Sequence, residues 1–183
     1  MSLELIIGPM FSGKSTTILR RVKRAEVIGI KPFIVTSVID TRYNTSTNLV
    51  KTHDTQTVDA VGLEDIKEIT LFAAFHDAKL IIIEEAQFFS GLYEMVKNLV
   101  EVYKRDVIVV GLDGDSDRKP FGEILQLVPL ADTITKLTAL CKRCGDGTPA
   151  LFTYSMWNKD TQVYVGDASI YEALCRKHYL KPT

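Results

Sequence analysis

The sequence has little of what marks a nucleic-acid-binding protein or a membrane protein. Its 183 residues carry a formal net charge of -1 and contain no long basic block. Proteins that bind phosphate backbones usually present a basic patch or stripe. No uninterrupted apolar run approaches the length that a membrane-spanning helix needs. We therefore expect neither a nucleic-acid partner nor a membrane partner.

Cysteines and targeting signals are also scarce. The chain has three cysteines, an odd number, and all of them lie after residue 140. Such a set makes a poor disulfide framework and favours a reducing, cytoplasmic setting. The first residues lack a basic start, and Glu4 interrupts their apolar run, so we expect no signal peptide.

The sequence does contain short apolar segments that alternate with amphipathic ones. Strands are predicted at residues 3–7, 33–38, 79–83 and 106–110, and helices at residues 15–28 and 91–103. Residues 40–56 and 111–122 are polar and turn-rich, which predicts loops. The alternation predicts an α/β fold with a parallel sheet flanked by helices. Ligands bind such sheets at the carboxyl ends of the strands, so the loops there converge on one site.

The segment GPMFSGKS, residues 8–15, follows the first predicted strand and opens the first helix. It fits the phosphate-binding pattern G-x-x-x-x-G-K-[ST], the P-loop. Backbone N–H groups of this loop point at phosphate oxygens, Lys14 reaches the transferred phosphates, and Ser15 binds Mg²⁺. A chance match is the alternative, but the strand before the segment and the helix after it are the context that the pattern requires.

Two acids, Glu84 and Glu85, follow the apolar residues 80–83. An acid at the end of a strand beside a P-loop can bind Mg²⁺ through water. It can also accept a proton from an attacking hydroxyl. Alternation along the strand puts the two side chains on opposite sides, but spacing does not assign the roles. The alternative is a solvated helix start, where glutamates are common.

The cysteines form two pairs of metal-ligand type, CKRC at residues 141–144 and CRKH at residues 175–178. Together Cys141, Cys144, Cys175 and His178 make a Cys₃His set that suits structural zinc, with no open position for catalysis. A redox CxxC is the alternative, but it leaves Cys175 and His178 unexplained. We place a domain boundary near residue 138. Residues 1–138 would then form the P-loop domain and residues 139–183 a small zinc-binding domain.

These motifs, in this order, resemble the type II thymidine kinases, the family of the cytosolic animal, poxvirus and many bacterial enzymes. The P-loop is generic, whereas the form PMFSGKST, the segment EAQFF and the zinc tail are together specific. Further matching segments are DTRY, GLDGD, RKPFG, KLTALCKRC, QVYVG and YEALCRKHY. The resemblance implies transfer of the γ-phosphoryl group of ATP, with Mg²⁺, to the 5′-hydroxyl of thymidine and also of deoxyuridine. It further implies a homotetramer or homodimer that is inhibited by thymidine triphosphate (dTTP).

The resemblance also implies roles for single residues. Glu85 matches the catalytic base, and Gln87 would help to place the hydroxyl. The segment between the two zinc pairs matches the family's lasso loop, which closes over the nucleoside. The residues that would contact ATP and Mg²⁺ are Gly8, Pro9, Met10, Phe11, Ser12, Gly13, Lys14, Ser15, Thr16, Asp40, Arg42, Glu84 and Gln87. The residues that would contact thymidine are Met10, Phe88, Ser116, Phe121, Thr153, Gln162, Val163, Tyr164, Val165, Gly166 and Tyr171.

Four positions depart from the family pattern. Glu84 stands where aspartate is usual, and Ser116 stands where animal and viral members often have phenylalanine. Ser155 replaces a frequent arginine, which leaves one cation fewer near the donor phosphate unless Arg118 or another cation replaces it. Asp167 stands where a second glycine is usual. These departures bear on which nucleoside is accepted, not on the P-loop, the base or the zinc ligands.

Other interpretations of the same residues stay open. Phe88, Tyr164 and Tyr171 can be ordinary core aromatics, since most such residues pack. Asp40 and Arg42 can be a surface ion pair of little energetic weight. A P-loop ATPase or motor is a rival function, but it needs a basic groove and usually a longer chain. A regulatory protein that binds nucleotide without catalysis is a second rival.

Overall fold

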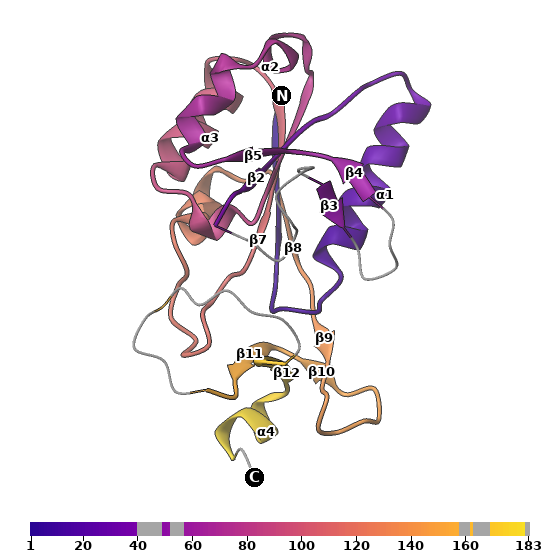
Figure 1. Ribbon diagram of the computed structural model, residues 1–183, viewed down its shortest axis with the longest axis vertical. Coiled ribbons are helices and arrows are strands. Elements are labelled where there is room, and N and C mark those ends of the chain that lie inside the picture. The colour runs from indigo at the N-terminus through magenta and orange to yellow at the C-terminus, as the bar shows by residue number, and fades with distance from the viewer. Residues whose placement is uncertain (40–48, 52–56, 158–161, 163–168, 182–183) are drawn as a thin grey trace.

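The computed structural model describes residues 1–39, 49–51, 57–157, 162 and 169–181. At its centre is a six-stranded sheet in the order β5–β2–β6–β7–β1–β8 (Figure 1). Every neighbouring pair in this sheet is parallel, as predicted. The strands are β1 (Ser2–Ile7), β2 (Phe33–Ser37), β5 (Val61–Leu63), β6 (Leu80–Glu84), β7 (Asp106–Gly111) and β8 (Thr133–Lys136).

Helices cover both faces of the sheet because successive side chains of the buried strands point to opposite faces. The helices are α1 (Lys14–Val27), α2 (Ala73–Asp77) and α3 (Leu92–Glu101), with 3₁₀ helices η1 (Ile66–Leu71), η2 (Ala86–Phe88) and η3 (Ile124–Leu130). Leu5 and Val109 share one apolar cluster with Val96 of α3. Ile6, the next residue after Leu5 on β1, packs in a second cluster with Ile18 of α1. In Figure 1, α3 and α1 lie on opposite sides of the sheet.

The structure corrects the sequence-based boundaries at several points. Residues 49–51, expected in a loop, form strand β3 (Leu49–Lys51), which pairs antiparallel with β4 (Thr57–Asp59). Strands β5 and β8 were not predicted from the sequence. β5 has three residues with a glycine at its centre, and β8 is largely exposed, so neither shows the apolar run of a buried strand. The predicted strands and helices at the other positions are confirmed within one or two residues.

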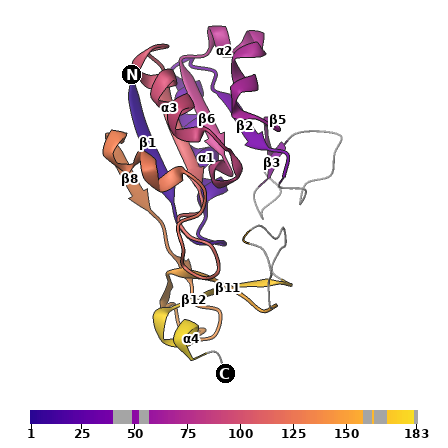
Figure 2. The same ribbon diagram turned by 90° about the vertical axis from the view of Figure 1, so that its left-hand side faces the viewer.

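The C-terminal residues form a small tail beyond the carboxyl ends of the sheet strands (Figure 2). Its elements are β9 (Ala139–Leu140), β10 (Pro149–Ala150), β11 (Phe152–Ser155), β12 (Tyr171–Leu174) and α4 (Arg176–Leu180). Its own apolar cluster includes Cys141, Leu174 and Cys175, and Phe11 of the P-loop packs against that cluster. The tail therefore lies against the edge of the sheet where the predicted ligand site is.

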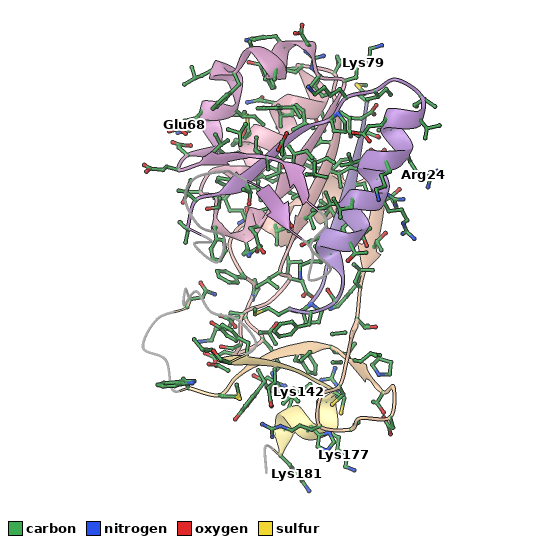
Figure 3. The ribbon with its side chains drawn as sticks, turned by 45° about the vertical axis from the view of Figure 1, so that its right-hand side comes forward. Arg24, Glu68, Lys79, Lys142, Lys177 and Lys181 are labelled. Atoms are coloured by element: carbon green, nitrogen blue, oxygen red, sulfur yellow. The ribbon has the colours of Figure 1, made fainter. Side chains whose placement is uncertain are left out.

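Charged side chains lie at the periphery of the sheet layers and of the C-terminal tail. Figure 3 shows Arg24 on α1 and Glu68 on η1 at the outside of the sheet layers, and Lys177 and Lys181 at the far end of the tail. Among the described residues, none of the helices combines the length and the apolar character that a membrane crossing requires.

Candidate active site and metal centre

The P-loop connects β1 to α1 in a backbone path that few residues adopt. Phe11 has φ 64° and Gly13 has φ 79°, both in the left-handed region. Gly8 allows close packing, because a Cβ there would lie 2.6 Å from the carbonyl oxygen of Leu137. The Lys14 ammonium lies across the loop and donates to the carbonyl oxygens of Pro9, at 2.8 Å, and of Gly8, at 3.3 Å. The loop thus holds its cation next to the backbone that would surround a phosphate.

The acid at the end of β6 reaches the P-loop directly. The Ser15 hydroxyl donates to a carboxylate oxygen of Glu84 at 2.8 Å, and Glu84 is only 7% exposed. These two residues are 69 positions apart in the sequence and come from different elements. A hydroxyl and a carboxylate are both hard oxygen ligands of the kind that Mg²⁺ prefers.

The second acid, Glu85, is held by a buried glutamine. Glu85 has φ 50°, so the chain turns sharply after β6 and separates its side chain from that of Glu84. The side-chain amide of Gln87 donates to Glu85 Oε2 at 2.6 Å, and its Oε1 accepts from the backbone N–H of Leu112 at 3.0 Å. Gln87 is 3% exposed. A carboxylate fixed in this way is suited to accept a proton from a defined direction.

Two glycines make room for this glutamine. A Cβ at Gly122, whose φ is 59°, would clash with the backbone carbonyl of Gln87. A Cβ at Gly111 would clash with its side-chain oxygen. The loop after β7 can therefore approach Gln87 closely only because both positions lack side chains.

Aromatic and tail residues gather next to these acids. Phe88 and Phe121 meet edge to face with ring centroids 5.5 Å apart, and Phe121 is buried. The Thr153 hydroxyl of β11 accepts from the backbone N–H of Met10 at 3.0 Å, and both residues are buried. Tyr171, at the start of β12, is also buried. The structure thus brings P-loop, β6, the loop after β7 and the tail together.

The remaining predicted residues are only partly described. Asp40, Arg42, Val163, Tyr164, Val165 and Gly166 lie outside the described residues. Gln162 is described, and its side-chain amide donates to Asp115 Oδ2 at 2.7 Å and to the Pro120 carbonyl at 3.2 Å. Sequence reasoning missed this role of Asp115, whose Oδ1 also accepts from the backbone N–H groups of Asp117 and Lys119. The run DGDSD was the available signal, because aspartates of this kind build turns.

Ser116 meets a residue that the sequence did not single out. Its carbonyl oxygen accepts from the Tyr179 hydroxyl at 2.5 Å. Burial raises the pKa of Tyr179 despite the opposing charge of Arg118, so the phenol stays protonated and donates. The guanidinium of Arg118 lies over this ring, 4.5 Å from its centroid.

The three cysteines and His178 form one compact cluster. Their ligand atoms all lie within 4.8 Å of one another, and no cysteine is in a disulfide. Cys144 Sγ and Cys175 Sγ are 3.8 Å apart, and His178 Nδ1 lies 3.3 to 3.6 Å from the three sulfurs. A tetrahedral zinc with Zn–S bonds of ~2.3 Å and a Zn–N bond of ~2.0 Å requires about 3.8 Å between sulfurs and about 3.5 Å between sulfur and nitrogen. The residues therefore fit zinc in both donor type and spacing.

The thiols of this cluster differ in acidity. Burial opposes ionisation of Cys141, but hydrogen bonds from the backbone of Cys175 and Cys144 and from His178 outweigh it and lower its pKa to about 6. Burial, together with the charge on Cys141, raises the pKa of Cys144 to about 11. Cys141 is thus the more acidic of these two thiols.

Comparison with known proteins gives one consistent result. The family model described as thymidine kinase matches residues 1–179. The chain is 40% identical to thymidine kinase a of Arabidopsis thaliana, over 98% of this chain and 75% of that protein. It is 38% identical to the cytosolic thymidine kinase of Homo sapiens, over 98% and 73% of the two chains. It is also 38% identical to a thymidine kinase of Bacteroides thetaiotaomicron, over 98% and 87%.

Proposed function

Because the chain belongs to the thymidine kinase family, we propose that it transfers the γ-phosphoryl group of ATP to the 5′-hydroxyl of thymidine. The product is thymidine monophosphate (dTMP), which nucleotide salvage supplies to DNA synthesis. The family resemblance noted in the sequence is thereby confirmed. The observation that carries the mechanism is the pair of acids at the end of β6, one bonded to the P-loop serine and the other to Gln87.

The donor side uses the P-loop. Residues 8–16 would surround the phosphates of ATP, and Lys14 would leave the loop carbonyls to contact the transferred group. Ser15 and Glu84 would hold Mg²⁺, which neutralises charge on the phosphates during transfer. Their hydrogen bond of 2.8 Å supports this pairing. Asp40 and Arg42 are assigned to the same phosphates and metal from the family resemblance alone.

The acceptor side uses Glu85 as general base. Its carboxylate takes the proton of the 5′-hydroxyl while that oxygen forms a bond to the γ-phosphorus. The bond from this phosphorus to the β,γ-bridging oxygen breaks, and ADP leaves. The hydrogen bond from Gln87 keeps the carboxylate in one orientation. A fixed Glu85 carboxylate accelerates the reaction most when the 5′-hydroxyl is also held next to it in a reactive geometry.

The nucleoside pocket would lie between the P-loop, the loop after β7 and the tail. Its proposed lining comprises Met10, Phe88, Ser116, Phe121, Thr153, Tyr171 and residues 162–166. Aromatic and apolar side chains suit the thymine ring. Deoxyuridine should also be accepted, because a single methyl group contributes only about 1–3 kcal/mol of discrimination.

The tail would hold a structural zinc through Cys141, Cys144, Cys175 and His178. Four protein ligands leave no position for a substrate, so the metal would fix the tail rather than take part in the transfer. Its separate apolar cluster supports a division of the chain into residues 1–138 and residues 139–183. The lasso between the two ligand pairs would then be anchored at both ends by the metal.

Assembly, regulation and location follow the family. We propose a homotetramer or homodimer that dTTP inhibits. A cytoplasmic location is supported by relatives whose names describe them as cytosolic. The alternative of an ATPase or nucleotide-binding protein without nucleoside specificity is not favoured, because the family and the relatives are thymidine kinases.

The first test is a nucleoside panel with Mg-ATP, with the monophosphates separated and quantified by chromatography. We expect thymidine to give dTMP and deoxyuridine to give its monophosphate, with one ADP formed per monophosphate in each reaction. Lys14→Met serves as the control against a contaminating kinase and should yield neither. Another nucleoside as the preferred acceptor would mean that Glu84 and Ser116 alter the pocket. Absence of any product would favour a binding-only protein.

A further inference from the structure

The loop from Leu112 to Phe121, called here the 112–121 loop, is attached at both ends next to β6, through Leu112 to Gln87 and through Phe121 to Phe88. Its tip is folded on itself. The backbone N–H of Asp115 donates to the Lys119 carbonyl at 2.9 Å, and the Lys119 N–H donates to Asp115 Oδ1 at 2.9 Å. The backbone N–H of Arg118 donates to the Asp115 carbonyl at 3.1 Å. Gly114 and Pro120 form an antiparallel bridge. The tip is thus a preformed turn, and its place relative to the rest of the site depends on contacts from outside.

One contact comes from the sheet, where the Lys136 ammonium of β8 lies 2.7 Å from Asp113 Oδ2. The contacts to the tip come from Gln162, which donates to Asp115 and Pro120, and from the end of the tail. The Tyr179 hydroxyl donates to the Ser116 carbonyl at 2.5 Å, across 63 residues of sequence. The Arg118 guanidinium lies 4.5 Å from the Tyr179 ring centroid and 5.8 Å from that of Phe152. Tyr179 thus contacts the 112–121 loop at two neighbouring residues, Ser116 and Arg118.

Tyr179 is itself fixed by the metal centre. It follows His178 directly, on helix α4, and its backbone N–H donates to the Cys175 carbonyl at 2.9 Å. Its ring packs at 5.2 Å from Phe152 and at 5.9 Å from Tyr154, both on β11. The phenol is therefore held from two directions, by two metal-ligating residues and by a strand of the tail.

We propose that Tyr179 is a positioning residue for the nucleoside pocket, which holds the 112–121 loop in place through the Ser116 carbonyl and the Arg118 guanidinium. Because Tyr179 is held by the metal centre, its contacts with the loop also fix the positions of Ser116 and Phe121. The inference rests on the proposed function, because it takes the 112–121 loop to line the thymidine site. It assigns no contact between Tyr179 and the substrate.

The test is Tyr179→Phe, which keeps the ring and its stacking and deletes only the hydroxyl. Loss of one hydrogen bond should raise the KM for thymidine roughly three- to tenfold. The kcat at saturating thymidine and the KM for ATP should stay within about twofold, because Glu85 and the P-loop are untouched. Zinc content by mass spectrometry should not change. Thymidine affinity by calorimetry without ATP should fall by the same factor as the KM rises.

A second measurement reads the loop directly. Arg118 is an exposed site for trypsin within the 112–121 loop, whereas Lys119 is followed by Pro120 and resists the enzyme. Cleavage after Arg118 should be faster in Tyr179→Phe than in the parent protein, because proteolysis follows local opening. Tyr103→Phe is the matched control. Tyr103 packs edge-on against Phe75 beyond the end of α3, at the edge of the sheet where the strands begin. Its replacement should change neither the KM for thymidine nor the rate of cleavage.

Each outcome decides the matter. The proposal would be overturned if Tyr179→Phe changed neither the KM for thymidine nor the rate of cleavage. It would also be overturned if the KM values for thymidine and ATP rose equally, or if the variant lost zinc. Either of these results would indicate a general loosening of the tail. Arg118→Gln, which removes the cation over the ring, should raise the KM for thymidine in the same direction by a smaller factor. The cleavage measurement does not apply to this variant, because the substitution removes the trypsin site. If the parent protein phosphorylates no thymidine, the proposed function fails. Faster cleavage in Tyr179→Phe would still support the tie between tail and loop.

Discussion

At the scale of the residue, Gln87 carries more of the site than its uncharged side chain suggests. It donates to Glu85 and accepts from Leu112, so it links the proposed base to the loop after β7. The sequence placed Glu85 and Gln87 in one segment, but not this geometry. Local spacing cannot reveal that a backbone N–H 25 positions further on would complete the amide's hydrogen bonds.

Replacing the base tests the chemistry of that arrangement. Glu85→Gln keeps the size and the partner of the side chain but removes its capacity to accept a proton. We expect kcat to fall by about 10²–10⁴. ATP binding, measured by calorimetry, should be retained, because Lys14, Ser15 and Glu84 are unchanged. A variant with parental turnover would remove Glu85 from the role of base.

A single methyl group tests the packing around Gln87. Gly122→Ala would place a Cβ against the Gln87 carbonyl, in a left-handed conformation with φ 59°. Gly29→Ala is the matched control, because Gly29 has φ 75° but nothing near a Cβ. The control should cost about 1 kcal/mol from backbone strain alone. Gly122→Ala should cost clearly more in urea denaturation and should also lower kcat, and equal losses in the two variants would contradict the clash.

At the scale of the element, the sequence revealed what long buried segments and local motifs encode. β1, β6 and β7 were predictable because apolar residues fill them, and the P-loop and zinc pairs because their spacing is local. β3, β5 and β8 were missed because they are short, glycine-containing or exposed, so periodicity carries no signal there. Contacts such as that of Tyr179 with Ser116 were missed because they join distant segments.

The N-terminus of α3 offers a prediction at this scale. Both carboxylate oxygens of Glu123 accept backbone N–H groups there, from Gly91 and from Tyr93, each at 2.9 Å. Glu123→Ala leaves two N–H groups without this acceptor and removes a negative charge from the positive end of the helix. We expect a loss of about 1–2 kcal/mol in the free energy of unfolding.

The opposite end of α3 provides the control. Glu101 is exposed at the last residue of the helix, where a negative charge opposes the helix dipole. Glu101→Gln should therefore be neutral or stabilise the protein by a few tenths of a kcal/mol. Chemical denaturation of both variants at low salt gives the comparison. A loss of stability at Glu101 as large as at Glu123 would refute the capping role.

At the scale of the whole molecule, the sheet and the tail meet at the proposed site. The Met10 N–H of the P-loop donates to Thr153 of β11, and Phe11 packs against the apolar cluster of the tail. The tail is small, with an apolar cluster made mainly of alanine, cysteine and leucine. Such a cluster stabilises a fold only weakly, so we expect the tail to depend on the zinc proposed for it.

Removing one metal ligand tests this dependence. Cys175→Ser should release zinc, as native mass spectrometry will detect, because serine is a poor ligand at neutral pH. Thymidine phosphorylation should fall with it, whereas ATP binding at the P-loop should persist. Lys177→Ala, an exposed change on the same helix, should keep both zinc and activity. Full zinc content in Cys175→Ser would refute the Cys₃His assignment.

The order of strands in the sheet limits when the chain can fold during its synthesis. β1 is made first, yet its two neighbours are β7 and β8, so Ser2 pairs with Asp106 and Leu5 with Ile134. The first strand can enter the sheet only after these residues have left the ribosome, and pairing over such separations is slow to form. The P-loop that follows β1 is thus translated before the strands that anchor it. A nascent chain stopped before residue 106 should bind no nucleotide.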